Sequence, residues 1–378
     1  MKKVWYNIDM EYIEIKEYFT DIETTENYSG YMYSVADAIT IAILGSICGL
    51  KNVSQIHQWA SSEKISKFLK EEFAINAVPC YFWLLTLLKM IKPESLNQCF
   101  VKFMEALLPQ KKKVISVDGK TIRSTAKMDS YEKPLHIISA QISELKMTLA
   151  QKTCSGKSNE IPTVKELLNS LNIKSCLVVA DALNCQKETA ETIVKNKADY
   201  LLCVKDNHRK LKREIEEYIN QNINKFETLT IKEKNHGRIE IRTAYVIQDT
   251  SWLSKKEDWI KLHTIGAIHR EFISKNKQTS EWHFYISSRK LNARKLLDDV
   301  RLEWSVETMH WLLDVHFNED FCRVEDKNVQ QNLNIFRKAA LNIINNFKSA
   351  SNSKRSISKV MFDCLLDTDH IKLVLNKN

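Results

Sequence analysis

The sequence predicts an α/β fold with an all-helical segment in front and a β-rich insertion inside the core. Residues 1–110 show helical periodicity, residues 114–204 show short apolar runs that alternate with helical stretches, and residues 205–290 show β-like runs. A chain of 378 residues is too long for one ordinary core. We therefore expect a helical domain at 1–110 and a second domain at 111–378, with the insertion at about 205–290.

The N-terminal segment begins with a polar, acidic lead-in and then has the pattern of several helices. We expect helices at 35–48, from 52 or 54 to 59, and at 63–73, 80–89 and 94–108. Two helices joined through Gly49 resemble a helix-turn-helix, which could dock on DNA. A pair that only packs in the core is the stronger expectation, because this segment is acidic and lacks arginine.

The second segment predicts a run of strands before helices and strands alternate. Strands are expected at 114–117, 135–143, 147–153, 176–180 and 200–204, with helices at 163–171 and 186–195 between the later ones. Three strands in sequence followed by this alternation is the order of a ribonuclease-H-like fold. Doubly wound nucleotide-binding folds lack the early antiparallel strands. Beyond residue 205 we expect a helix at 209–219, strands at 228–233, 239–247, 262–272 and 282–288, and one long helix from 292 to about 317.

Two acids follow apolar runs in this pattern. Asp118 follows the run that begins at Val114, and Asp181 closes the run that begins at Cys176, so neighbouring strands could each end in a carboxylate. A third acid, Glu307, lies near one face of the long helix among aromatic residues. Taken on its residues alone, Glu307 is more simply a half-exposed glutamate at the edge of an amphipathic stripe. Three such acids together would form a divalent-metal site.

Charge and composition narrow the classes of function. The net charge is +9, yet residues 1–100 hold nine Lys and no Arg against twelve acids, so the excess of cations lies later in the chain. This distribution fits a polyanion-binding protein or, equally, a lysine-rich protein of an AT-rich genome. The nine cysteines form no CxxC pair, which disfavours zinc. The sequence has no signal peptide pattern and no apolar run long enough to span a membrane, so we expect a cytoplasmic protein without a membrane partner. It also has no phosphate-binding glycine motif.

Six short motifs occur in one order along the chain. They are Val117-Asp118-Gly119-Lys120, residues 157–162 (KSNEIP), residues 181–186 (DALNCQ), residues 199–205 (DYLLCVK), residues 236–240 (HGRIE), and residues 304–307 (WSVE) with 310–315 (HWLLDV). Together they closely resemble the ISAs1 family of insertion-sequence transposases, and the resemblance covers nearly the whole chain. It implies a DDE transposase with a ribonuclease-H-like core.

The resemblance also implies a site, cofactors and partners. Asp118, Asp181 and Glu307 would be the catalytic and metal-binding triad for two Mg²⁺ (or Mn²⁺) ions, and for Glu307 this outweighs the simpler interpretation. The partners would be double-stranded DNA, at the element's ends and at the target, with a homodimer formed on DNA. Weaker candidates for DNA contact are Lys120, Arg123, Lys205, Asn207, His208, Arg209, His236 and Arg238.

One departure limits what can be carried over. Transposases of the broader IS4 group carry a Tyr, Arg, Glu, Lys signature around the catalytic glutamate, whereas Glu303 and Asp314 stand at the Arg and Lys positions here. DNA-end contacts and hairpin chemistry tied to that signature are therefore not expected to transfer. Two alternatives stay open: a catalytically silent DNA-binding protein descended from a transposase, and another nuclease on the same fold.

Overall fold

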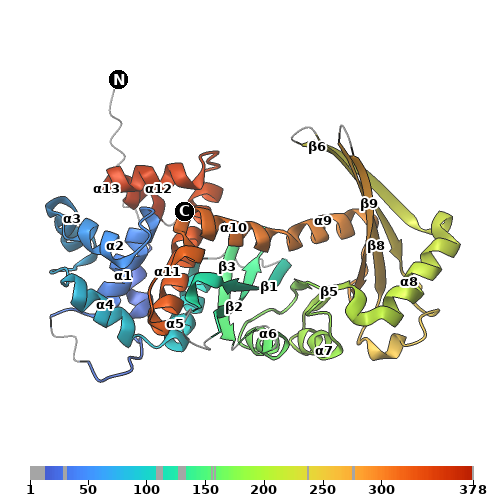
Figure 1. Cartoon of the computed structure of the whole chain (residues 1–378), viewed down its shortest axis with the longest axis horizontal. Coiled ribbons are helices and arrows are strands. Elements are labelled where there is room, and N and C mark those ends of the chain that lie inside the picture. Colours follow the sequence, from blue (N-terminus) through green and yellow to red (C-terminus); the bar gives the residue numbers. More distant parts are fainter. Residues whose placement is uncertain are drawn as a thin grey trace.

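The protein is described by a computed structural model that covers residues 13–28, 32–107, 114–126, 133–154, 156, 159–235, 238–274 and 277–376. The expected domain boundary at 111–113 and the candidate His236 lie outside the described residues. Helices from both ends of the chain gather on one side of the molecule, and a long β-ribbon extends from the other (Figure 1). Among the described helices, none is long and apolar enough to cross a membrane.

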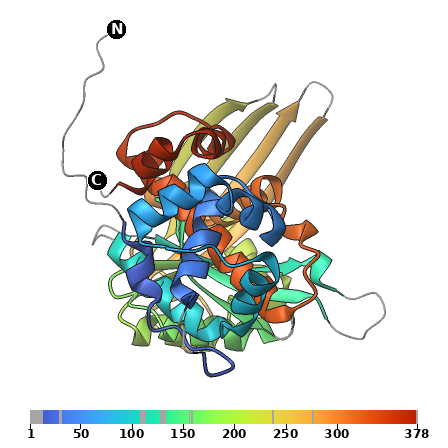
Figure 2. The ribbon, with the colours of Figure 1, turned by 90° about the vertical axis from the view of Figure 1, so that its left-hand side faces the viewer.

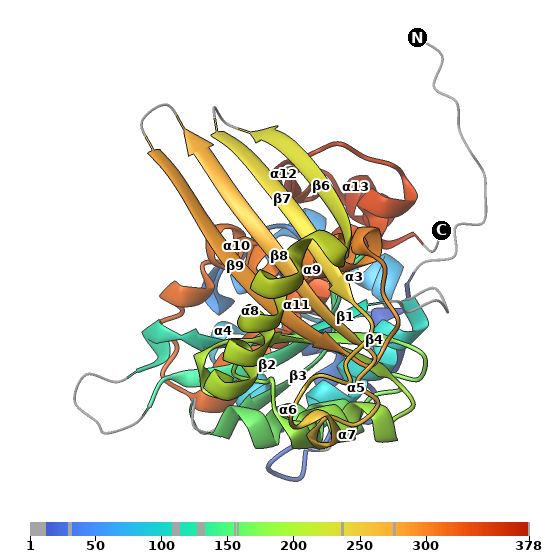
Figure 3. The ribbon, with the colours of Figure 1, turned by 90° about the vertical axis from the view of Figure 1, so that its right-hand side faces the viewer.

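The described strands form one sheet in the order β3-β2-β1-β4-β5-β9-β8-β7-β6. Figure 3 shows the last four strands, β9 to β6, rising away from the rest; we call them the β-ribbon. The strands are β1 (Val114–Ile122), β2 (Leu135–Ile142), β3 (Met147–Cys154), β4 (Leu177–Ala180), β5 (Asp199–Val204), β6 (Glu227–Asn235), β7 (Arg238–Ile247), β8 (Thr264–Ser274) and β9 (Lys277–Ser287).

The first five strands have the expected sequence of pairings. β1, β2 and β3 form an antiparallel meander, and β4 and β5 then add in parallel to β1. The expectation that β1 ends before Asp118 was wrong, because the strand continues to Ile122. Its parallel pairing with β4 stops at Val117↔Ala180, whereas its pairing with β2 continues as far as Ile122↔Leu135.

The β-rich insertion extends the same sheet. β9 runs antiparallel to β5, and β8, β7 and β6 follow outward in antiparallel order. The four expected strands of the insertion are all present. β6, β7 and β9 are longer than their patterns indicated, whereas β8 has the expected length of eleven residues and begins two residues later. The charged helix α8 (Arg209–Asn222) leads into them.

Helices cover both faces of β4 and its neighbours. Leu177 and Val179 belong to one apolar cluster, which includes Leu296 and Val300 of α9 (Ala293–Glu303). The alternate residues of β4 belong to the main core, together with apolar side chains of α6 (Glu160–Asn169) and α7 (Lys187–Lys195). Burial on both faces explains why this strand is apolar throughout rather than alternating.

The long helix expected at 292–317 is two helices, so that expectation was wrong. α9 ends at Glu303, and α10 (Ser305–Phe317) begins after a break at Trp304. The side chain of Ser116 donates a hydrogen bond to the carbonyl oxygen of Leu302 at 3.1 Å. In a continuous helix, the Leu302 carbonyl oxygen would accept from the backbone N–H four residues later. Here it accepts from a side chain of β1, at the point where the helix breaks.

One helix near the C-terminus ties the two ends of the chain together. α11 (Lys327–Ala350) packs against α1, α4, α5 and β3, and Figures 1 and 2 show it running between them. α1 has eleven of its thirteen residues buried, so the helix pair around Gly49 packs in the core, with only α2 partly exposed. The remaining helices are α1 (Val35–Ile47), α2 (Val53–Ala60), α3 (Glu63–Phe73), α4 (Tyr81–Met90), α5 (Pro93–Leu107), α12 (Ile357–Leu366) and α13 (Thr368–Leu375).

Candidate active site

Asp118 and Asp181 are neighbours at the point where β1 and β4 part. The two strands pair in parallel up to Val117↔Ala180, and each acid is the next residue of its chain. The side chain of Asp118 is 28% exposed, and Asp181 is half-buried. Two acids that the sequence places 63 residues apart therefore lie side by side at one edge of the parallel strands.

Glu307 approaches this pair from the first turn of α10. Burial, together with the negative charges of Asp181, Glu160 and Glu307, raises the pKa of Asp118 to about 7. Glu307 itself is exposed, and within the described residues its carboxylate makes no hydrogen bond or ion pair. The three acids predicted from the sequence thus lie close enough for their charges to interact.

Glu307 does not lie among buried aromatic side chains. Trp304 is 46% exposed and Trp311 is 58% exposed, so this side of α10 is open to solvent. The cost of burying a carboxylate among aromatic rings therefore does not arise. An open face also leaves Glu307 accessible to a ligand.

A fourth carboxylate, Glu303, belongs to the same electrostatic group. Burial raises the pKa of Glu303 to about 8, and the charges of Asp181, Asp118 and Glu307 act in the same direction. Sequence reasoning did not propose it as a site residue, although it lies one helical turn before Glu307, the spacing that puts side chains on one face. The positive charge of Lys205, which is exposed after β5, partly opposes the shift.

His310 is a further neighbour that the sequence did not single out as a ligand. Its Nδ1 lies 3.6 Å from Oδ2 of Asp118, beyond hydrogen-bond distance. Burial lowers the pKa of His310 to about 3, assisted by the positive charges of Lys338 and Lys120. The imidazole is therefore neutral at physiological pH.

Lys120, predicted to contact DNA, points into the protein. Its ammonium binds Asp314 of α10 and lies 2.6 Å from Oε2 of the fully buried Glu319, which also accepts from Asn334 of α11. Two carboxylates thus already neutralise this lysine, which ties β1 to α10. Arg123, three residues later, is exposed in a short 3₁₀ turn.

The candidates after β5 divide into two groups. Asn207 donates to the carbonyl oxygen of Ala182 at 2.6 Å, and His208 lies 2.6 Å from the carbonyl oxygen of Cys185, so both side chains hold the loop that follows Asp181. Lys205 and Arg209 are exposed beside them. The second pair is free to face a ligand, whereas the first is engaged with the backbone.

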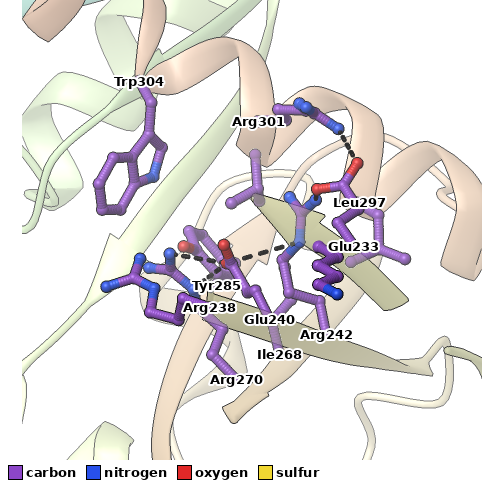
Figure 4. Close-up of a pocket in the computed structure, with 12 residues that line it drawn as sticks. Glu233, Arg238, Glu240, Arg242, Ile268, Arg270, Tyr285, Leu297, Arg301 and Trp304 are labelled. Carbon is purple, nitrogen blue, oxygen red and sulfur yellow. Dashed lines mark hydrogen bonds and ion pairs between the residues drawn. The ribbon is translucent and has the colours of Figure 1, made fainter. Parts of the chain in front are cut away.

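Arg238 lies in a cleft of about 760 Å³ between the β-ribbon and α9. Figure 4 shows four arginines and Trp304 around this cleft. Arg238 stacks over Phe272 at 4.4 Å, and Arg270 lies 4.8 Å from the Trp304 ring centre. Several of these cations are paired with Glu233 and Glu240, but within the described residues Arg238 makes no ion pair.

The donor set at the site suits hard divalent cations. Carboxylate oxygens are the ligands that Mg²⁺ and Mn²⁺ prefer. The pKa of Asp118 is raised mainly by burial and also by neighbouring negative charges, which a cation would offset. No three His, Cys, Asp or Glu side chains of the described residues are grouped tightly enough to hold one ion.

Comparison with known proteins gives two family matches and several full-length relatives. Residues 109–343 match the family described as "Transposase DDE domain", and residues 16–104 match "DDE_Tnp_1-associated". The chain is 30% identical to "H repeat-associated putative transposase YhhI" of Escherichia coli over 96% of this chain and 98% of that one. It is 29% identical to "Putative protein YbfL" of the same organism over 97% and 98%.

A solved structure, a piggyBac transposase synaptic complex with hairpin DNA, is similar at a TM-score of 0.45 and 11% identity over 95% of this chain and 77% of that one. A likeness of that size does not establish a fold.

Proposed function

Because the chain belongs to the family of transposases that carry a DDE domain, we propose that it cuts DNA at the terminal repeats of an insertion sequence and joins the freed 3′-hydroxyl ends to target DNA. The observation that carries the proposal is that Asp118 and Asp181 lie side by side at one sheet edge, with Glu307 of α10 near enough for its charge to act on Asp118. We also infer that the five strands β1 to β5, with their 3-2-1-4-5 order, are a ribonuclease-H-like core.

The three acids would hold two Mg²⁺ or Mn²⁺ ions. Bound there, such ions supply an activated water and stabilise the leaving oxygen of a phosphodiester. Asp118 is the acid on which the charges of both Asp181 and Glu307 act.

Side chains around the acids would hold them in place. Lys120 fixes α10 to β1 through Asp314, and so sets how far Glu307 lies from Asp118. Asn207 and His208 hold the loop after Asp181. These three residues, first expected to touch DNA, are better assigned to positioning.

The exposed cations would line the DNA path. Arg123, Lys205 and Arg209 are exposed, and Arg238 lies on strand β7. Contacts of this kind bind phosphates and release counterions without reading sequence. The two family matches, 16–104 and 109–343, support a division near residue 110, with the helical segment as a candidate for binding the element's ends.

The reaction itself suggests the remaining partners. Joining two ends of one element requires two sites at once, so we propose a homodimer on DNA. The protein would act in the cytoplasm, where bacterial DNA lies.

Strand cleavage on a labelled duplex tests the proposal. The duplex carries the DNA that flanks the gene, and wild type is compared with Asp118→Ala, Asp181→Ala and Glu307→Gln in Mg²⁺. Nicking at the repeat boundary that each substitution abolishes is the expected result. Metal-dependent cleavage without regard to terminal repeats would instead favour another nuclease, and binding without cleavage by the wild type would favour a silent DNA-binding descendant.

A further inference from the structure

A chain of polar side chains lies behind Asp181 and leads away from the solvent. Nδ2 of Asn184 donates to Oδ1 of Asp181 at 3.1 Å and to Oε1 of Glu160 at 2.9 Å. Oε2 of Glu160 lies 3.0 Å from Nε2 of His136, whose Nδ1 lies 2.8 Å from the hydroxyl of Thr121. The chain joins the loop after β4 to α6, β2 and β1.

The middle of this chain is fully enclosed. Glu160 and His136 are each 3% exposed, and Asn184 is 0% exposed. A buried carboxylate costs free energy unless its oxygens accept hydrogen bonds, and here each oxygen of Glu160 has one partner. With Glu160 ionised and the ring neutral, Nε2 of His136 carries the hydrogen and Nδ1 accepts from Thr121. Every link then has a donor and an acceptor.

The chain also packs against the backbone beside Asp118. A Cβ added to Gly119 would lie 2.7 Å from Nε2 of His136 and 2.8 Å from Oε2 of Glu160. Both distances are shorter than van der Waals contact allows, so any residue larger than glycine would displace the pair. The same two side chains therefore support the backbone at Asp118 and the carboxylate of Asp181.

Asn184 fixes Asp181 through one oxygen only. Both its side-chain Nδ2 and its backbone N–H donate to Oδ1, each at 3.1 Å. Within the described residues, Oδ2 makes no hydrogen bond, so it is the oxygen left to face a ligand. Partners that hold the far side of a metal-binding carboxylate orient it and affect metal affinity.

We propose that Glu160 is a positioning residue that, through Asn184, orients Asp181 for a divalent cation. The inference rests on the proposed function, because it takes Asp181 to be a cation ligand. Glu160 would not touch the cation or the DNA. It holds the amide of Asn184 between two carboxylates, so that neither hydrogen of the amide is free to turn away.

Manganese binding by the full chain, without DNA, tests the role separately from catalysis. The dissociation constant for Mn²⁺ is measured from the free-ion electron paramagnetic resonance signal for wild type, Glu160→Ala, Glu160→Gln, Asn184→Ala and Asp118→Asn. The matched control is Asn332→Ala, since Asn332 is also 0% exposed but bonds to carbonyls of Leu88 and Ile91. Thermal unfolding in EDTA reports the cost of each substitution to stability.

We expect Glu160→Ala and Asn184→Ala to weaken Mn²⁺ binding by roughly 10-fold to 100-fold. The control should lose stability but keep the wild-type dissociation constant. Glu160→Gln should stay within about 3-fold of wild type, because its carbonyl accepts from Asn184 and its NH₂ donates to the other tautomer of His136. If Glu160→Ala does not fold, Asn184→Ala alone decides, since it leaves the Glu160–His136 pair intact.

The inference is overturned if Asp118→Asn abolishes Mn²⁺ binding but Asn184→Ala, or folded Glu160→Ala, keeps the wild-type affinity. If Asp118→Asn also binds Mn²⁺ as wild type does, the proposed metal site fails, and the inference with it.

Discussion

The two halves of the sheet differ in how deeply their side chains are buried. We call strands β1 to β5 the covered half and the β-ribbon the open half. All residues of β2 and β4 are buried, and β5 is buried beyond its first residue. In β7 the buried residues lie near the C-terminal end, and in β8 they lie near the N-terminal end. The remaining residues of both strands are half-buried or exposed and include several Arg and Glu. The covered half can fix acids through enclosed hydrogen bonds, whereas the open half can only present charge. Enclosed hydrogen bonds and exposed charge thus belong to different parts of one sheet.

The largest effect should come from removing an acid of the candidate site. Glu307→Gln should lower strand cleavage by roughly 10³-fold or more, since a metal clamp stabilises a transition state by several kcal/mol. Glu303→Gln, one turn earlier on the neighbouring helix, should cost less than about 10-fold. Single-turnover cleavage of a labelled duplex measures both, and a reversed order would make Glu303 the third ligand.

A backbone substitution should disturb the covered half without removing any polar group. Gly119→Ala places a methyl group against His136 and Glu160, and overpacking of this kind costs about 1–3 kcal/mol. Chemical denaturation measures the loss in the free energy of unfolding. Gly156→Ala makes a comparison, because a Cβ there meets only the Lys133 side chain, at 3.5 Å, although its φ of +138° adds strain of its own. An unchanged free energy of unfolding for Gly119→Ala would mean that the pair moves aside freely.

The stability of the metal-free protein should depend on pH through Asp118. The folded-state pKa of Asp118, about 7, exceeds its usual value, so the folded state keeps a proton that the unfolded state has released. Its contribution to stability is therefore lost as pH rises from about 4 to 7. We expect Asp118→Asn to raise the melting temperature of metal-free protein more at pH 8 than at pH 5. Stabilisation by Mn²⁺ should likewise increase over this range, as followed by calorimetry.

The smallest effect should come from the open half. Arg238→Ala should weaken binding to duplex DNA only a few-fold and reduce the slope of log K against log salt by about 1. Mn²⁺ affinity should not change. Arg355→Ala offers a control, since Arg355 is paired with Asp363 in the C-terminal region. Fluorescence anisotropy at several salt concentrations gives the slopes, and equal slopes for the two variants would contradict a role of the β-ribbon in binding DNA.

Much of the fold followed from local patterns. The runs that end near Asp118 and Asp181 predicted adjacent strands, because β-formers followed by an acid mark a buried strand edge. The helix α11 received no prediction. Buried Asn332, Arg337 and Lys338 interrupt its apolar stripe, and a sequence cannot show that such groups will find partners. Burial lowers the pKa of Lys338 to about 7, which reflects how unusual its position is.

The supports of the candidate site were missed for a related reason. Lys120 stands two residues after an acid and suggested a phosphate contact, but its partners lie 194 and 199 residues away. Glu160 is 24 residues from both His136 and Asn184. Pairings of this range depend on the topology of the whole sheet, which no local pattern encodes.

The position of α11 also has a consequence for synthesis. Arg337 donates to the carbonyl oxygen of Lys51, 286 residues earlier in the chain, and α1 packs against the same helix. At about 5–20 residues per second, a ribosome takes roughly 15–60 s to make that interval. During that time the apolar helix α1 is already made, whereas α11, which covers it, is not. A chain cut short before residue 327 never acquires that cover, so interrupted copies should aggregate or be degraded rather than persist as folded N-terminal fragments.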